Sequence, residues 1–132
     1  MKYYVAGPMS HIPQFNFPAF FKARDELTAM GYSVLLPCDM DDTAAVEAAM
    51  ASVDGKPGSS MLTWGQCLGK DVELIADHVK GIIFLPGWKN SRGARLEAFV
   101  GTLCGHKFME YDFTGPPQDV STDYVMRSLF NP

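Results

Sequence analysis

Short apolar runs alternate along the chain with longer segments in which apolar residues recur at helical spacing. Four of the short runs are bounded by turn-forming or polar residues and have the length and composition of strands. These predicted strands are KYYVAG at 2–7, YSVLLP at 32–37, GIIFLP at 81–86 and HKFMEYD at 106–112. The run at 81–86 holds no polar side chain, which is typical of a strand that helices cover on both faces.

Helices are predicted between and after these strands. Asn16 is expected to cap the first helix, Pro18 fits its first turn, where a missing N–H is harmless, and Gly31 ends it. The other predicted helices span residues 43–53, 61–78, 93–104 and 122–130. Residues 54–60, DGKPGSS, have the composition of a mobile loop and are a candidate lid.

This alternation predicts βαβ units, and therefore a parallel sheet with helices on both faces. A chain of 132 residues is long enough to bury one core, so residues 1–132 are interpreted as a single domain. Ligands of open parallel sheets bind beyond the carboxyl ends of the strands. The segments that follow strands, 7–16, 37–42 and 86–94, are therefore expected to line one cleft.

The segment GWKNSRGARLE at 87–97 leads from the most apolar strand into a helix through a turn with two glycines. A helix N-terminus presents free N–H groups and the positive end of a dipole to an anion, and Ser91 and Arg92 could add donors. Phosphate is the expected anion. The alternative is that Ser91 only caps the helix and Gly93 only makes room for it.

Two carboxylates are candidates for catalysis. Glu97 lies one or two turns into the helix after this turn, near enough to reach a ligand in the cleft. Asp71 lies three residues after Leu68 and four before Ile75, at the border of the inward face of its helix. Two carboxylates in one cleft can cleave a glycosidic bond, one as nucleophile or oxocarbenium stabiliser and the other managing protons. The alternative for Glu97 is a solvated carboxylate stabilised by the helix dipole.

Other side chains near the cleft could contact a ligand. Trp88 could stack on a base or could pack in the core, and His11 could hydrogen-bond a nucleobase or a phosphate. The acidic run DMDD at 39–42 resembles a carboxylate metal cluster, but capping and solvation account for it. Neither a metal nor a cofactor is expected.

The net charge and the cysteine content indicate which binding partners and which cellular compartment are expected for this protein. A formal net charge of -4 predicts no broad basic surface, which favours a small-molecule substrate over a nucleic-acid polymer. The three cysteines, without a CxxC pair, are interpreted as reduced, buried thiols: Cys38, Cys67 and Cys104. The apolar runs are too short for a signal peptide or a membrane span, which predicts a cytoplasmic protein with no membrane partner.

Four segments, taken together and in order, resemble the nucleoside 2-deoxyribosyltransferase superfamily over residues 3–108. They are YVAGPM at 4–9, NFPAFFKARDELTAMGYSVLLP at 16–37, KDVELIAD at 70–77 and LPGWKNSRGARLE at 85–97. The likeness is greatest to a branch that is common in phages and prophages and is usually left as a domain of unknown function. It implies a flavodoxin-like or Rossmann-like three-layer fold with four or five parallel strands. It also implies an enzyme that cleaves the N-glycosidic bond of nucleosides or nucleoside 5′-monophosphates.

The resemblance implies a role at each matching position. Glu97 would attack C1′ of the sugar, Asp71 would handle the proton of the base or grip the sugar, and Tyr4 would orient the nucleophile. The amides of Ser91 and Gly93 would hold a 5′-phosphate. The other residues expected at the substrate are Gly7, Pro8, His11, Trp88 and Arg92.

Two departures from the resembled pattern leave the function open. Relatives often follow the nucleophile with an aliphatic residue and Gly, whereas this chain has Ala98 and Phe99. The first loop also lacks the glycine- and arginine-rich character of the monophosphate hydrolases. Three functions are compatible with the sequence: an N-glycosidase acting on a nucleoside monophosphate, a deoxyribosyltransferase that exchanges bases, and a non-catalytic nucleotide-binding sensor.

The resemblance further implies a homodimer or a larger homo-oligomer. Aromatic side chains near the tail, residues 113–132, would suit such an interface, although they would equally suit packing within one chain. They are Tyr111, Phe113, Tyr124 and Phe130.

Overall fold

A computed structural model describes residues 1–38, 40, 42–56 and 63–130. The described strands are β1 (Lys2–Ala6), β2 (Ser33–Leu35), β3 (Gly81–Phe84), β4 (Lys107–Glu110) and β5 (Gln118–Val120). The α-helices are α1 (Phe17–Ala29), α2 (Thr43–Met50), α3 (Trp64–Asp77), α4 (Arg92–Cys104) and α5 (Thr122–Phe130). Two short 3-10 helices, η1 (Pro13–Asn16) and η2 (Trp88–Asn90), precede α1 and α4.

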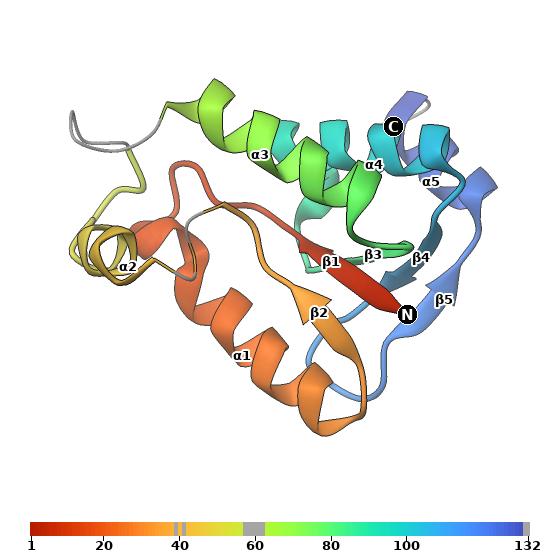
Figure 1. Ribbon diagram of the computed structural model, residues 1–132, viewed down its shortest axis with the longest axis horizontal. Helices are drawn as coiled ribbons and strands as arrows, with labels where there is room; N and C mark the ends of the chain where they lie inside the picture. Colours follow the sequence, from red (N-terminus) through yellow and green to blue (C-terminus); the bar gives the residue numbers. More distant parts are fainter. Residues whose placement is uncertain (39, 41, 57–62, 131–132) are drawn as a thin grey trace.

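The strands form one sheet in the order β2-β1-β3-β4-β5, in which the first four are parallel (Figure 1). In the register of the central strands, Tyr4 of β1 lies opposite Leu35 of β2 and Ile82 of β3. The predicted α/β class and the flavodoxin-like three-layer arrangement are confirmed. The sheet is not wholly parallel, however, because β5 runs antiparallel to β4.

The antiparallel fifth strand follows from the short connection that precedes it. Residues 111–117 join β4 to β5, too few for the crossover that a parallel pair requires. Phe113 takes a left-handed conformation, with φ 68°, and the backbone N–H of Thr114 donates to the Asp112 carboxylate at 3.0 Å. This turn reverses the chain, so the strand returns along β4 in the opposite direction.

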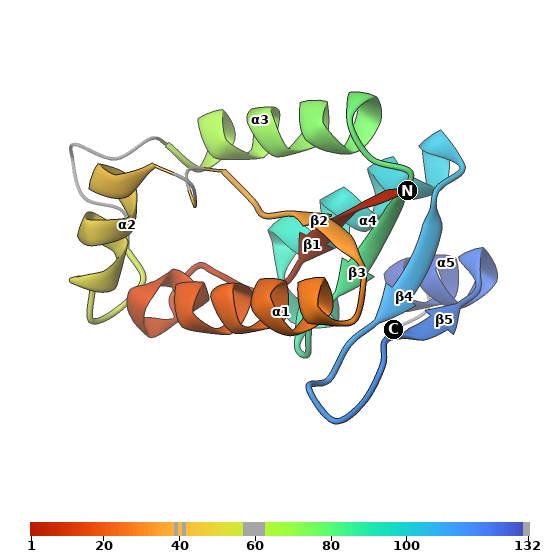
Figure 2. The same ribbon diagram turned by 60° about the horizontal axis from the view of Figure 1, so that its bottom comes forward.

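Helices cover the two faces of the sheet, as Figure 2 shows for α1 on one side and α3 on the other. Alternate residues of each central strand supply the two cores. Tyr3 and Val5 pack with α1 and α2, whereas Tyr4 and Ala6 pack with α3, α4 and α5. Because side chains alternate across a strand, neighbouring tyrosines in β1 lie in different cores.

The start of α1 differs from the prediction. Asn16 does not cap the helix with its side chain; its backbone is left-handed, with φ 61°, and its Nδ2 donates to the carbonyl of Pro8 at 3.0 Å. Gln14 and Phe15 are also left-handed. The side-chain amide of Asn16 therefore connects the end of the loop after β1 to the residues at the end of that strand, and it does not cap α1.

The other helix boundaries agree more closely with the sequence. Asp42 caps α2 by accepting from the N–H of Ala45 at 2.9 Å, which confirms its capping role, but the helix ends at Met50, before the predicted 53. α3 begins after Thr63, which forms a full capping box with Gln66. The predicted start of this helix at 61, residues 39 and 41 of the acidic run, and residues 57–60 of the candidate lid lie outside the described residues.

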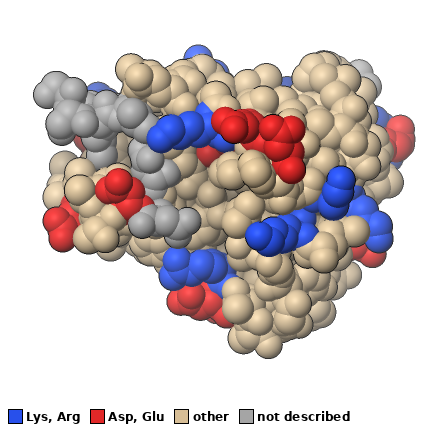
Figure 3. Space-filling view, in the orientation of Figure 1, with Lys and Arg blue, Asp and Glu red and all other residues tan. Residues whose placement is uncertain are grey.

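Charges on the face of Figure 3 are mixed in sign, and its described residues form no broad basic patch. The prediction of three buried thiols is wrong in part, since Cys67 is only half-buried and Cys104 is exposed. No helix in the described ranges is both long and apolar enough to cross a bilayer.

All four tail aromatics make contacts within the chain, and the ring centre of Phe113 lies 5.0 Å from that of Tyr111. The hydroxyl of Tyr111 donates to Glu26, and that of Tyr124 donates to Glu110 at 2.9 Å. Phe130 is 58% exposed, and its ring packs edge-on against Phe99. Self-packing therefore accounts for much of the tail, and the homo-oligomer stays a prediction.

We expect Gly101→Ala in α4 to lower the free energy of unfolding by roughly 1–3 kcal/mol, because overpacking a well-filled core has that cost. A Cβ there would lie 2.7 Å from Cδ1 of Ile82 and 3.0 Å from Cε1 of Phe108. The matched control is Gly69→Ala on α3, where no other group in the described part of the chain lies within 4 Å of the new Cβ. That change should raise stability by about 0.5–1 kcal/mol, the difference in helix propensity. Urea denaturation of both variants checks the prediction, and equal effects would contradict it.

Candidate active site

The central strands β1 and β3 lie side by side, but the chain leaves their carboxyl ends toward opposite edges of the sheet. Such a switch point is where ligands bind in open α/β sheets. The two strand ends approach closely here, since a Cβ on the buried Gly7 would lie 3.0 Å from Cβ of Leu85. Gly87 turns the chain with φ 87° beside Pro8. Gly7 and Pro8 thus border the predicted crevice, and their ligand contacts stay predictions.

Three buried polar side chains meet on the α3 and α4 side of β1. The hydroxyl of Tyr4 donates to Oε2 of Glu97 at 2.6 Å, and Glu97 shares a further hydrogen bond with Asp71. Tyr4 is fully buried, and Asp71 and Glu97 are each 5% exposed. The structure therefore brings together the three residues predicted to be catalytic, from β1, α3 and α4. The alternative of a solvated Glu97 is wrong.

The surroundings of Glu97 favour its protonated form. Burial raises the pKa of this carboxyl well above its ordinary value of 4.5, and the neighbouring Asp71 charge and the hydrogen bond to Asp71 raise it further. The hydrogen bond from Tyr4 acts in the opposite direction. A hydrogen bond between two carboxyl groups needs a proton on one of them, which agrees with the raised pKa of Glu97. Burial also raises the pKa of Tyr4 well above 10.0, so its hydroxyl stays a donor.

Asp71 is oriented by a hydrogen bond from a backbone N–H group. The N–H of Cys38, in the loop after β2, donates to Oδ1 of Asp71 at 2.7 Å. A backbone donor stabilises the ionised form of a carboxylate. The Tyr4 phenol also forms a side-chain hydrogen bond with Asp71, so it serves both carboxyls, whereas the Cys38 amide donates to Asp71.

The N-terminus of α4 lies about one turn beyond Glu97, after the carboxyl end of β3. Ser91 caps it by accepting from the N–H of Ala94 at 3.3 Å, so the capping interpretation of Ser91 is confirmed. Arg92 is exposed, and its guanidinium carbon lies 4.9 Å from the centre of the Trp64 ring. Gly93 also faces Trp64, since a Cβ at this glycine would lie 3.9 Å from its Nε1. Phosphate binding by this helix end stays a prediction.

The structure favours packing over base stacking for Trp88. The indole is 3% exposed and stacks on Phe84 with ring centres 4.1 Å apart, and its Nε1 donates to Glu110 at 2.8 Å. His11 is exposed in the left-handed conformation, and its backbone N–H donates to the carbonyl of Gly55 at 3.1 Å. This contact joins the loop after β1 to residue 55 of the loop after α2, while a role for the imidazole stays a prediction.

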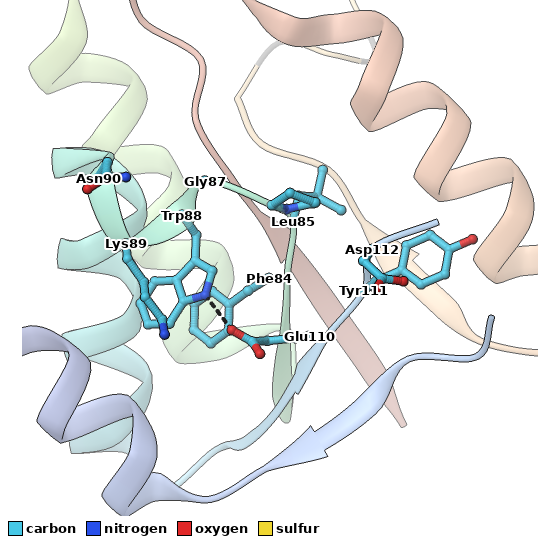
Figure 4. A pocket seen from close by; sticks show the side chains of 10 residues that line it. Phe84, Leu85, Gly87, Trp88, Lys89, Asn90, Glu110, Tyr111 and Asp112 are labelled. Atoms are coloured by element: carbon cyan, nitrogen blue, oxygen red, sulfur yellow. Dashed lines mark hydrogen bonds between the residues drawn. The ribbon is translucent and has the colours of Figure 1, made fainter. Parts of the chain in front are cut away.

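A shallow hollow of about 300 Å³ lies at the carboxyl ends of β3 and β4 (Figure 4). Trp88, Glu110 and Asp112 contribute to its lining, but Tyr4, Asp71 and Glu97 do not. The hollow is therefore separate from the carboxyl cluster. Over the described ranges, no group of three or more His, Cys, Asp or Glu side chains is placed to hold a metal ion.

Two groups at the site were not predicted from the sequence. The Cys38 amide carries no side-chain signal, because any non-proline residue supplies the same N–H. Trp64 could have been found, since it lies seven residues before Asp71 and shares its helix face after two turns.

Residues 1–110 match the family described as a domain of unknown function, DUF4406. The match runs from β1 to the end of β4 and so includes Tyr4, Asp71 and Glu97. No curated protein and no solved structure matches the chain. The family description does not mention the deoxyribosyltransferase superfamily, so that resemblance remains an expectation.

We expect the free energy of unfolding to fall as the pH rises from about 4.5, the ordinary value for Glu97, through its raised pKa. Over that window the folded protein binds a proton that the unfolded chain has released. The loss is about 1.4 kcal/mol for each unit by which folding raises the pKa. Glu97→Gln should flatten this slope, whereas Glu73→Gln, at an exposed position of α3, should retain it. Urea denaturation between pH 5 and 9 measures both, and a wild-type slope in Glu97→Gln would refute the assignment.

Proposed function

We propose an activity from the site itself, because the chain belongs to the DUF4406 family, and the description of that family assigns no function. The proposed enzyme is an N-glycosidase that hydrolyses the bond between base and sugar in a nucleoside or deoxynucleoside 5′-monophosphate. The observation that carries the proposal is the buried cluster in which Tyr4 donates to Glu97 and Glu97 is hydrogen-bonded to Asp71. The position of this cluster beside the β1/β3 switch point supports a ligand there.

A carboxyl pair with one proton suits the cleavage of a glycosidic bond with retention. One carboxyl must be ionised to attack the sugar, and the other must be protonated to assist the leaving group. Repulsion between two buried charges prevents both groups from ionising at once. The proton that Glu97 holds in the free protein moves to Asp71 when substrate binds, and the hydrogen bond from Tyr4 stabilises the ionised Glu97 that becomes the nucleophile.

In the first step, a carboxylate oxygen of Glu97 bonds to C1′ of the sugar. The bond between C1′ and the base nitrogen breaks, its electron pair goes to the base, and Asp71 gives the base its proton. In the second step, Asp71 takes a proton from water while the water oxygen bonds to C1′ and the ester bond to Glu97 breaks. The products are the free base and the sugar phosphate, and both carboxyls return to their starting states.

The N-terminus of α4 favours a substrate with a 5′-phosphate. Free N–H groups at a helix N-terminus and the dipole of the helix attract an anion, and Arg92 at the first helical position adds a full positive charge. This local cation offsets the overall charge of -4 where a phosphate would approach. Arg95, one turn further, is engaged elsewhere, because it donates to the carbonyls of Ser128 and Leu129 in α5.

We expect wild-type protein to release free base from at least one nucleoside 5′-monophosphate, and to act far more weakly on the same nucleoside without its phosphate. The panel contains canonical and 5-modified ribo- and deoxyribonucleotides, with release followed by chromatography. Glu97→Ala should abolish release, because the attacking oxygen is removed.

The same panel separates the other functions. Base exchange that requires an added acceptor base, without net hydrolysis, would identify a transferase. Nucleotide binding that survives Glu97→Ala, with no release by either protein, would identify a sensor and refute the hydrolase.

Tyr4→Phe should lower kcat by about 10- to 100-fold, the equivalent of losing a hydrogen bond to a charged group worth roughly 1.5–3 kcal/mol. The ring stays in its core, but Glu97 loses the donor at 2.6 Å that favours its ionised form. The matched control is Tyr3→Phe, since Tyr3 packs against the opposite face of the sheet. Equal kcat values for the two variants would exclude an orienting role for Tyr4. Steady-state assays on any nucleotide cleaved by wild type provide the comparison.

A further inference from the structure

We propose that Trp64 is the aromatic platform on which the nucleobase of the substrate stacks, at the open end of the crevice. This inference deepens the proposed function and rests on it, because it presupposes a nucleotide bound with its sugar at Glu97. It assigns binding of the base to the first residue of α3, outside the Tyr4, Asp71 and Glu97 cluster.

Helix geometry places Trp64 on the same side of α3 as Asp71. Seven residues separate them, which is two turns and about 10 Å along the helix axis. On the neighbouring helix, Arg92 precedes Glu97 by five residues, or about 7.5 Å. The contact between Trp64 and Arg92 is a second contact between α3 and α4, nearer the helix N-termini than that of Asp71 with Glu97.

The indole of Trp64 is held in position but is not buried. It is 45% exposed, with Arg92 over its ring at 4.9 Å and Gly93 of α4 beside its Nε1. The capping box of Thr63 and Gln66 holds the backbone at this end of α3. An aromatic ring with a fixed orientation and open surface loses little entropy when a flat partner stacks on it.

The other tryptophan cannot serve in this way. The chain has two, and Trp88 is 3% exposed, with one ring face on Phe84 and its N–H bonded to Glu110. The base must also leave after cleavage, and α3 and α4 both begin at the edge of the sheet where the crevice opens. A base bonded to C1′ at Glu97 and directed toward that edge meets Trp64.

The test compares Trp64→Ala and Trp64→Phe with wild type in binding a nucleoside 5′-monophosphate and deoxyribose 5-phosphate, which lacks the base. Trp64→Ala should weaken nucleotide binding by about 5- to 150-fold, which is roughly 1–3 kcal/mol of stacking at 1.4 kcal/mol per tenfold. It should leave binding of deoxyribose 5-phosphate unchanged, and Trp64→Phe should restore most of the loss. In assays, KM should rise while kcat changes little.

Intrinsic fluorescence gives a readout that does not depend on turnover. Nucleotide should quench the emission of wild type, and this quenching should vanish in Trp64→Phe, in which the buried Trp88 still emits. Thermal melting checks that the variants are folded.

Equal nucleotide affinity in wild type and Trp64→Ala would overturn the platform, even where base release by wild type upholds the N-glycosidase. Equal losses for nucleotide and deoxyribose 5-phosphate would also overturn it, because Trp64 would then act through the phosphate site. Binding with the expected Trp64 dependence but without cleavage would uphold the platform and refute the N-glycosidase. Failure of wild type to bind any nucleotide would refute both.

Discussion

The buried hydrogen bond from Tyr4 to Glu97 is the contact on which this structure depends. It joins the central strand β1 to α4, and the hydrogen bond between Glu97 and Asp71 extends the connection to α3. Two carboxyls removed from water destabilise a fold unless hydrogen bonds and a retained proton compensate them. Tyr4 and the Cys38 amide supply the bonds. A protein that keeps such a carboxyl pair is expected to lose stability as the pH rises. Such a loss is typical of sites where the carboxyls have a chemical role.

Close helix packing is what brings the cluster together. Small residues line the face of α4 that contacts the sheet, and Gly101 leaves no space for a Cβ beside Ile82 and Phe108. Because α4 packs this closely on the sheet, Glu97 lies in the core next to Tyr4. Because α3 and α4 both begin at the carboxyl edge of the sheet, their N-termini, Arg92 and the Trp64 ring lie at that edge. The proposed chemistry and the proposed recognition of the base thus occupy successive turns of two neighbouring helices.

Periodicity predicted most of the secondary structure because apolar spacing records which face of an element is buried. It failed where a side chain is bound by a partner outside its own helix or strand. The sequence predicts Asn16 as a helix cap, but its side-chain amide donates to the carbonyl of Pro8. The sequence also makes Trp88 a candidate ligand contact, but its indole packs on Phe84 and donates to Glu110. The strand β5 is only three residues long and pairs at one edge, so no alternation marked it.

The sequence by itself determined the α/β class, the single order of strands and helices along the chain, and the candidate residues Tyr4, Asp71 and Glu97. These follow from local spacing and from motifs, which the chain carries whether it is folded or not. Only the tertiary structure decided that the three side chains meet in one buried cluster, that burial and the neighbouring Asp71 raise the pKa of Glu97, and that Trp64 stands beside Arg92. Distances between elements and the removal of water exist only after packing, and both hydrogen bonding and pKa depend on them.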